Sequence, residues 1–202
     1  MTTINAVNLE VSDPTAAARF YADAFGLTDE VRFSEAQEAS SGFRGFTLSL
    51  TVSQPSIVDS YISSAVAAGA STLKAPSKSL WGYGGSVQAP DGAIWKVASS
   101  SKKDSGPTVR KFERMVLLLG VESVSATKRF YVERGLSVSK SFGPTYAELE
   151  TSSGPVQLAL YKRRALAKDA GVPAEGSGSH RLTILSDLGS FTDPDGFTWA
   201  NG

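Results

Sequence analysis

The sequence contains no cysteine and only one histidine, His180, among its 202 residues. The absence of cysteine excludes disulfide bonds, thiolate nucleophiles and cysteine metal sites. The single histidine restricts metal and acid–base chemistry, because histidine is the commonest metal ligand and general base. Long apolar runs are also missing: the longest, Met115–Leu119, is far short of the roughly 20 residues that a membrane-spanning helix needs.

The chain has no excess of charge of either sign. Lysine plus arginine and aspartate plus glutamate each total 20, so the formal net charge is zero. No global basic field is available to recruit nucleic acid or an anionic membrane, and the basic run Lys162–Asp169 is expected to be a solvated helix face. The first residues, MTTINAVNLEV, lack a secretory signal pattern. We therefore expect a cytoplasmic protein with no nucleic-acid or membrane partner.

An internal repeat is present instead. The segment Arg19–Tyr21 (RFY) recurs as Arg129–Tyr131, 110 positions later. Towards the end of each half, Ala89–Trp95 (APDGAIW) is echoed by Asp193–Trp199 (DPDGFTW). Two motifs that recur in the same order at nearly the same offset indicate two copies of one structural unit.

A polar segment, Ser99–Pro107, separates the two copies. It has no hydrophobic period and ends in Gly-Pro, which is typical of a linker. We therefore predict a first βαβββ unit at residues 1–99, a linker at 100–110 and a second βαβββ unit at 111–202.

Local signals predict the elements of the first half. Asp13 before Pro14 is typical of a helix start, and Gly26 of a helix end. Apolar residues alternate with polar ones in Phe46–Thr51, which predicts a half-buried strand. The remaining predicted elements are a strand at Ala6–Val11, a helix at Ser56–Ala68, and strands within STLK, GGSVQA and IWKVAS, the last two joined by the turn Pro90-Asp91-Gly92.

The second half starts in the same way but is shorter. Its predicted elements are a strand at Met115–Val121, a helix at Ser125–Arg134, a strand at Val156–Tyr161, a short helical stretch, and a strand at His180–Leu185. Only a few residues separate that last strand from the turn at 194–196. This leaves no room for a counterpart of the helix at 56–68, so the second unit is predicted to be trimmed.

The sequence resembles the vicinal oxygen chelate superfamily in several motifs, in their order and in their duplication. These are a strand followed by VSDP, a helix that contains RFY, the GL after that helix, and a PDG hairpin followed by an aromatic residue. This superfamily includes glyoxalases, bleomycin-resistance proteins and ring-cleaving dioxygenases. The resemblance implies an α+β fold in which paired βαβββ units form curved mixed sheets around a cup that holds a ligand or metal. Such units often pair across chains, so a monomer and a homodimer both remain open.

The resemblance also implies where a metal would be held. One ligand position corresponds to Ala6 in the first unit and Val116 in the second, and another corresponds to Lys96 and Ala200. Alanine and valine have no donor atom, and lysine brings a positive charge. We therefore expect no metal and no cofactor. Lys96 either binds a ligand oxygen from inside the cup or extends to solvent.

Aromatic and basic residues are the candidates for ligand binding. Trp81 and Tyr83 lie in the glycine-rich stretch LWGYGGS, where a loop can close over a small molecule. Trp95 and Trp199 occupy matching positions after the two PDG turns, where they either line a ligand site or pack in a repeated core. Arg44 is a further polar candidate for the cup.

Two kinds of function follow from these residues. The leading expectation is a metal-independent protein that binds a small, partly hydrophobic molecule in its cup, as drug-binding resistance proteins do. The alternative is a metal-independent lyase- or isomerase-type enzyme, for which His180, Glu148 and Tyr146 are the candidate acids and bases. A metal-dependent glyoxalase or dioxygenase requires ligands from other positions.

Overall fold

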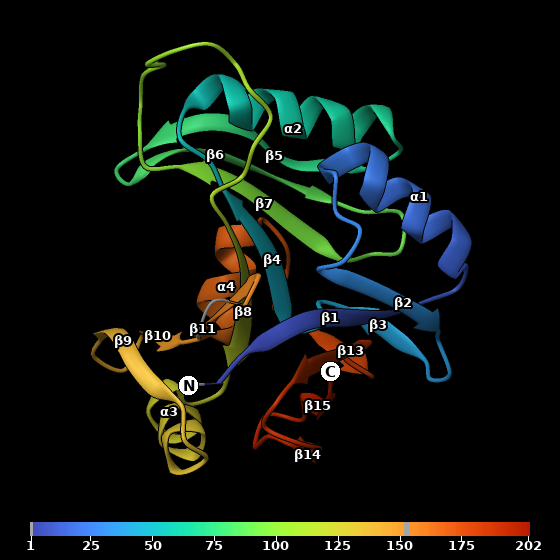
Figure 1. Cartoon of the computed structure of the whole chain (residues 1–202), viewed down its shortest axis with the longest axis vertical. Coiled ribbons are helices and arrows are strands. Elements are labelled where there is room, and N and C mark those ends of the chain that lie inside the picture. Colours follow the sequence, from blue (N-terminus) through green and yellow to red (C-terminus); the bar gives the residue numbers. More distant parts are fainter. Residues whose placement is uncertain (1, 152–153) are drawn as a thin grey trace.

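The computed structural model describes residues 2–151 and 154–202, which fold into two large mixed β-sheets and one two-stranded sheet, with helices on both sides (Figure 1). The first half contains β1 (Ile4–Val11), α1 (Pro14–Phe25), β2 (Val31–Glu35), β3 (Ser40–Gly42), β4 (Phe46–Thr51), α2 (Pro55–Ala67), β5 (Ser71–Ser79), β6 (Gly82–Gln88) and β7 (Ile94–Ser99). The second half contains β8 (Arg114–Val121), α3 (Val124–Glu133), β9 (Ser137–Phe142), β10 (Tyr146–Glu150), β11 (Val156–Lys162), α4 (Arg163–Ala170), β12 (Gly176–Gly178), β13 (Leu182–Ser186), β14 (Phe191–Thr192) and β15 (Thr198–Asn201).

Both large sheets combine strands from the two halves. The eight-stranded sheet has the order β5-β6-β7-β4-β8-β11-β10-β9, and the five-stranded sheet has the order β14-β15-β13-β1-β2. The halves meet at the antiparallel pairs β4–β8 and β1–β13. The predicted α+β class with curved mixed sheets is therefore confirmed. The division at residues 100–110 stays a prediction, because neither sheet belongs to one half alone.

The strand registers reveal which positions of the two halves are equivalent. Leu9 pairs with Leu182, and its repeat partner Leu119 pairs with Phe46. Leu182 therefore corresponds to Phe46, and two residues earlier His180 corresponds to Arg44.

The second half is trimmed as predicted, since only residues 187–190 separate β13 from β14. The first half is trimmed too, which the sequence did not suggest. Residues 26–30 alone join α1 to β2, so the hairpin β9–β10 has no counterpart there. Residues 36–39 alone join β2 to β3, so α4 is an element of the second half only.

Local capping explains the predicted helices. The side chain of Asp13 accepts a hydrogen bond from the backbone N–H of Ala16 at 2.9 Å, and Gly26 ends α1 in the left-handed conformation at φ 70°. Ser123 caps α3 in the same manner. These helices and α2 bury their apolar faces in one large core that includes β1, β4, β7, β8 and β11. Among the described residues, every helix falls short of what a membrane crossing requires in length and apolar character.

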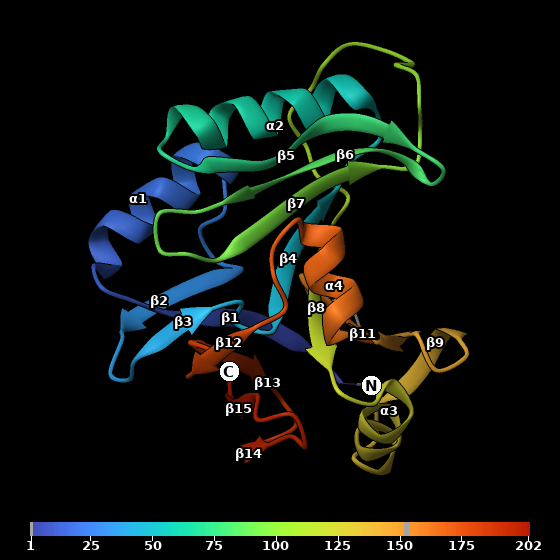
Figure 2. The same cartoon turned by 180° about the vertical axis from the view of Figure 1, so that it is seen from behind.

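The fourth helix, α4, lies on the opposite face of the eight-stranded sheet, over β4, β8 and β11 (Figure 2). Its buried residues Leu166, Ala167 and Ala170 form a second, smaller core with Phe43 and Ile94. The basic residues Lys162, Arg164 and Lys168 are exposed, as predicted for a solvated helix face, but the opposite face of α4 is buried, which the sequence analysis did not anticipate.

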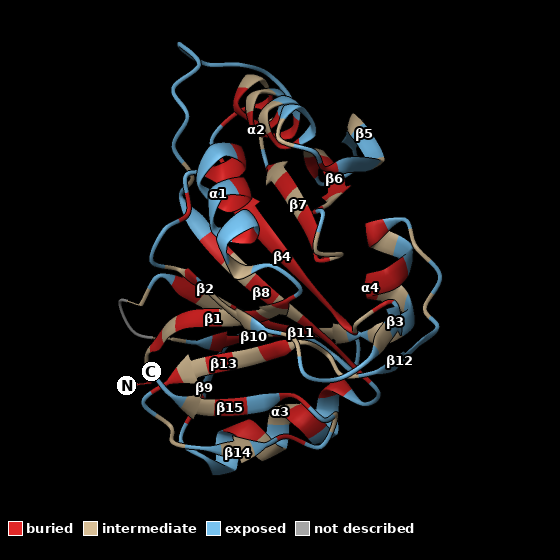
Figure 3. Cartoon of the chain, turned by 90° about the vertical axis from the view of Figure 1, so that its right-hand side faces the viewer, coloured by how far each residue is buried: buried red, intermediate tan, exposed pale blue. Residues whose placement is uncertain are grey.

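Two further predictions about strands are corrected by this arrangement. The strand β4 is buried on both faces rather than half-buried (Figure 3), because α4 covers Thr47 and Ser49, which are 4% and 7% exposed. The strand predicted to open at His180 begins only at Leu182. Arg181, with a positive φ of 51°, interrupts the extended backbone before it.

Candidate ligand-binding site

The face of the eight-stranded sheet that α4 covers carries a row of paired residues at its centre. In register, Lys96 pairs with Ser49, Ser49 with Val116, and Val116 with Gln157. This row contains Lys96 and Val116, the two positions at which the resemblance implies metal ligands. Gln157 has a possible ligand oxygen, but its side-chain amide nitrogen donates to the carbonyl of Leu149 at 2.5 Å.

The three residues paired at the equivalent position of the five-stranded sheet are apolar. Ala6 pairs with Leu185, and Leu185 pairs with Ala200. No cluster of three or more histidine, cysteine, aspartate or glutamate side chains suited to a metal ion occurs in the part of the chain that the structure describes. The residues at the two cup centres therefore do not fit a divalent cation, which needs oxygen, imidazole or thiolate donors.

The carboxyl end of α4 is held to the same face by side chains of three adjacent strands. Lys96 Nζ lies 2.5 Å from the Asp169 carboxylate, and Lys74 Nζ donates to the carbonyls of Lys168 and Asp169 at 2.9 and 2.6 Å. Ser86 Oγ donates to the carbonyl of Ala170 at 2.9 Å. Cations are favourable partners for the last carbonyls of a helix because those groups carry its negative dipole end.

Beside this contact, a cavity of about 270 Å³ remains open, which we call the α4 pocket. It is lined chiefly by the strands β5, β6 and β7 and by Asp169, and its side chains include Lys74, Trp81, Tyr83, Ser86 and Lys96. The indole of Trp81 is 84% exposed, whereas Tyr83 is half-buried and donates to Asp59 at 2.8 Å. The pocket thus unites Trp81, Tyr83 and Lys96, three of the residues predicted to bind a ligand.

The glycine-rich strand β6 is needed for the floor of this pocket. A Cβ at Gly84 would lie 2.9 Å from the carbonyl oxygen of Val97, and one at Gly85 would lie 3.0 Å from that of Lys74. The glycines therefore permit a close approach of backbones, which is a different role from the mobile loop that the sequence suggested.

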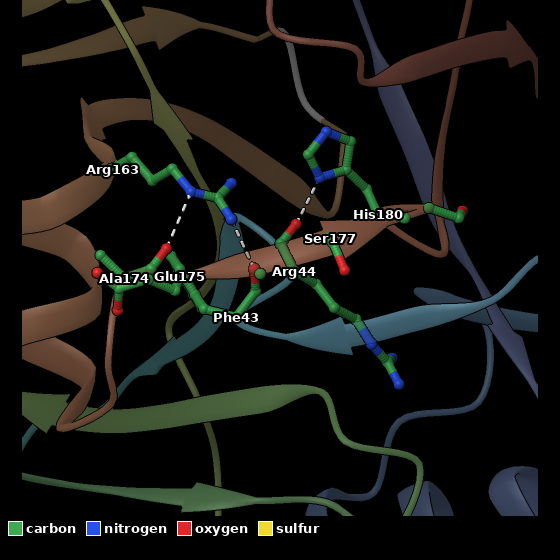
Figure 4. A pocket seen from close by; sticks show the side chains of 10 residues that line it. Phe43, Arg44, Arg163, Ala174, Glu175, Ser177 and His180 are labelled. Carbon is green, nitrogen blue, oxygen red and sulfur yellow. Dashed lines mark hydrogen bonds between the residues drawn. The ribbon is translucent and has the colours of Figure 1, made fainter.

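Arg44 and His180 lie in a separate, polar cavity of about 410 Å³ (Figure 4), which Arg163 and the segment 174–180 also line. His180 Nδ1 is 2.5 Å from the carbonyl oxygen of Arg44, and Nε2 is 3.1 Å from that of Asp195. The ring also stacks on Phe197 at 4.0 Å. With a carbonyl against each nitrogen, the ring bridges the two halves and has no nitrogen directed at a ligand.

The Arg44 side chain turns towards the PDG turn of its own half. Its Nη2 donates to the carbonyl of Asp91, while its Nη1 is buried with no hydrogen-bond partner among the described residues. Burial lowers the pKa of Arg44; the Asp91 carboxylate opposes this effect and Arg181 adds to it.

Tyr146 and Glu148 lie at the other end of the eight-stranded sheet, on β10. The Tyr146 hydroxyl donates to Glu148 at 3.2 Å, and Arg114 lies 3.5 Å from the other Glu148 oxygen. Burial and the Glu148 charge raise the pKa of Tyr146 to about 12. The structure therefore does not bring these two residues together with His180 or with the α4 pocket.

Trp95 and Trp199 are 0% and 1% exposed, respectively, in the core. Trp95 donates its indole N–H to Tyr21 at 3.1 Å, and Tyr21 donates to Asp91 at 2.8 Å. The second half repeats the Trp–Tyr pair with an aspartate two residues earlier in the turn: Trp199 donates to Tyr131 at 3.2 Å and Tyr131 to Asp193 at 2.5 Å. Burial is the main cause that raises the pKa of both tyrosines. This placement favours core packing, the second of the two interpretations left open by the sequence.

Sequence reasoning missed Lys74, Ser86 and Asp169 as pocket residues. Ser86 is paired in register with Lys74 on one side and Lys96 on the other. Aligning the strands would therefore have identified Lys74 and Ser86 as neighbours of Lys96. Asp169, in contrast, reaches the pocket only because α4 packs on the sheet.

Solved structures resemble this chain in fold. Glyoxalase I from Zea mays superposes with a TM-score of 0.64 and 15% sequence identity, over 98% of this chain and 91% of that one. A candidate dioxygenase from Bacillus subtilis subsp. subtilis str. 168 superposes with a TM-score of 0.54 and 12% identity, over 91% of this chain and 69% of that one.

At the level of sequence, no protein-family model matches the chain, and no curated protein matches it. The identities to the solved structures are low, so the likeness is one of fold. The expected glyoxalase-like fold is thereby confirmed.

Proposed function

We propose that this protein binds a small, partly hydrophobic molecule in the α4 pocket without a metal ion. The observation that carries the proposal is the meeting of Trp81, Tyr83 and Lys96 around one cavity on the cup face of the sheet. An exposed indole provides apolar contact area, and the adjacent ammonium and hydroxyl groups fix orientation, which is the usual composition of a small-molecule site.

The charge of the central row supports binding without metal. Lys96 stands at a position where the resemblance implies a metal ligand, and Lys74 adds a second ammonium to the same face. A divalent cation placed there would meet two positive charges and no complete ligand set.

The surroundings of the candidate acids and bases support binding rather than turnover. A general base must reach the proton that it removes to within about 3 Å or through one water. His180 lines a different cavity and has both nitrogens against carbonyl oxygens. Tyr146 and Glu148 face each other on β10 rather than lining the α4 pocket.

A screen by thermal shift tests this proposal. Protein purified in a chelator is exposed to a diverse set of small organic molecules, and a molecule that binds the folded state raises the melting temperature. The affinities of the molecules that do so are then measured for Trp81→Ala and for a matched control, Phe142→Ala, which removes an exposed aromatic at the far edge of the same sheet.

We expect Trp81→Ala to weaken binding by about 10- to 30-fold, as for an aromatic side chain that the ligand covers, and Phe142→Ala to leave it unchanged. Binding that appears only after a divalent metal is restored would contradict the proposal. So would binding that both variants retain in full, because the ligand would then lie outside the α4 pocket.

A further inference from the structure

The α4 pocket has an unequal charge balance. Two ammonium groups, Lys74 and Lys96, line it, with Asp169 as the only carboxylate among its lining residues. Lys96 is paired with that carboxylate, whereas Lys74 reaches only backbone carbonyls and forms no ion pair with any described residue. One positive charge is therefore without a full negative partner.

The two ammonium groups are arranged as a pair. Lys74, Ser86 and Lys96 stand side by side in register on three adjacent strands, with the serine in the middle. Both lysines reach the same residue of α4: Lys96 Nζ contacts the Asp169 carboxylate at 2.5 Å and Lys74 Nζ contacts the Asp169 carbonyl at 2.6 Å. One carboxylate-sized group is thus within reach of both.

We infer that the α4 pocket takes an aromatic carboxylate, whose carboxylate binds Lys74 and Lys96 and whose ring lies along Trp81 and Tyr83. Asp169, at the carboxyl end of α4, binds Lys96 in the absence of ligand, and the ligand carboxylate displaces it. This inference rests on the proposed function and deepens it by naming the charge and the shape of the ligand.

Size and chemistry limit the ligand further. The cavity of about 270 Å³ is at the lower end of the ~300–1,000 Å³ usual for drug-sized ligands, which suits an acid of one or two rings. A monoanion brings the pocket to charge neutrality, whereas a cation adds repulsion and a neutral molecule leaves Lys74 without an anionic partner. Lysine ammonium groups and a tryptophan face are complementary to a carboxylate on a flat ring.

The test compares 2-naphthoate with its uncharged analogue 2-naphthamide by isothermal titration calorimetry in chelator. The two probes share the ring and differ in charge. We expect 2-naphthoate to bind at least about tenfold more tightly, as a charge-assisted contact gives. Acrylamide quenching of tryptophan fluorescence adds a site-specific readout, since Trp81 is exposed while Trp95 and Trp199 are buried.

Three variants locate the charge. Lys74→Gln should reduce the preference for 2-naphthoate to within about twofold, because one of two charge-assisted contacts is lost. Lys78→Gln is the matched control on the same strand: Lys78 pairs with Tyr83 in register but does not line the pocket, so the preference should be kept. Asp169→Asn should strengthen 2-naphthoate binding by about two- to fivefold and leave 2-naphthamide unchanged, as expected from removing a partly exposed ion pair.

Several results would overturn the inference. Equal affinity for the two probes would reject the anionic ligand while leaving the proposed function standing. If Lys74→Gln and Lys78→Gln lowered the preference for 2-naphthoate equally, the preference would come from general surface charge. If Asp169→Asn bound 2-naphthoate more weakly, Asp169 would contribute to ligand binding rather than compete with the ligand for Lys96. Failure of both probes to bind at millimolar concentration would also reject this ligand class; the thermal-shift screen then decides separately whether the pocket binds anything.

Discussion

The cup faces of the two sheets are built from equivalent positions but are completed differently. Thr47 and Ser49 on β4 correspond to Thr183 and Leu185 on β13. The first two are buried beneath α4, while the second two are half-exposed. The difference comes from one inserted segment, residues 163–175, for which the first half has only residues 36–39. The covered pocket therefore depends on two features that the other sheet lacks: the segment that forms α4, and the strand β5, for which residues 187–190 leave no room in the second half.

The largest expected effect concerns the anchoring of α4. Leu166 is 1% exposed in the core beneath α4, so Leu166→Ala should lower the free energy of unfolding by about 2–4 kcal/mol. Leu185→Ala, on the half-exposed face of the other sheet, should cost about 1 kcal/mol or less. Urea unfolding of both variants measures the contrast. Equal losses would mean that α4 does not distinguish the two faces.

The paired triads provide the next contrast. Tyr131→Phe leaves the buried Asp193, which is 5% exposed, without its hydroxyl donor and should cost about 1–3 kcal/mol of unfolding free energy. Tyr21→Phe acts on Asp91, which is half-exposed and can turn to water, so its cost should be about 1 kcal/mol. Thermal and urea unfolding of the two variants test the order. A larger loss for Tyr21→Phe would reverse it.

The pH dependence of stability offers a finer test of the second triad. Burial raises the pKa of Asp193 above the 3.8 of a free side chain, although the hydrogen bond from Tyr131 opposes the rise. The folded state therefore holds this proton more tightly than the unfolded state, and the contribution to stability falls as the pH rises from about 3.8 through the raised folded pKa.

Asp193→Asn removes that titration. Relative to the variant, the wild-type protein should be more stable at the acidic end of this range than at pH 7, by less than the cost of Tyr131→Phe. Urea unfolding at a series of pH values measures the difference. A difference that is constant with pH, or that grows towards neutral pH, would argue against the stated role of burial.

The smallest effect on stability is expected at the charged end of α4. The side chains of Lys96 and Asp169 are 35% and 44% exposed, so their ion pair is well screened by solvent. Lys96→Met should therefore change the free energy of unfolding by less than about 1 kcal/mol. A loss approaching that of Leu166→Ala would show that the ion pair, rather than apolar burial, holds α4 on the sheet.

Sequence patterns predicted the elements whose signals are local. The Asp13 and Gly26 caps, the RFY helices and the PDG turns depend on a few neighbouring residues, and these predicted α1, α3 and the strand β7 closely. The strands β9 and β10 were missed. Every residue of β9 is exposed, so it has no apolar alternation to detect.

The candidate site was only partly predictable. Trp81, Tyr83 and Lys96 were identified from composition and from the resemblance, and they line one pocket. Lys74 reaches the pocket because of the strand register, and Asp169 reaches it because of the packing of α4. Neither feature can be read from a single sequence. His180 was predicted to open a strand, but that strand begins two residues later, at Leu182.

Metal content tests the central claim most directly. The two central rows, Lys96–Ser49–Val116–Gln157 and Ala200–Leu185–Ala6, lack a set of donors that fits a divalent cation, since Gln157 is the only amide or acid side chain in either. The protein is purified without chelator, passed through a sizing column and analysed by elemental mass spectrometry. Our account predicts zinc, nickel, manganese and iron far below one atom per chain, with the melting temperature unchanged on adding chelator. One tightly held atom per chain, with a lower melting temperature after its removal, would contradict it.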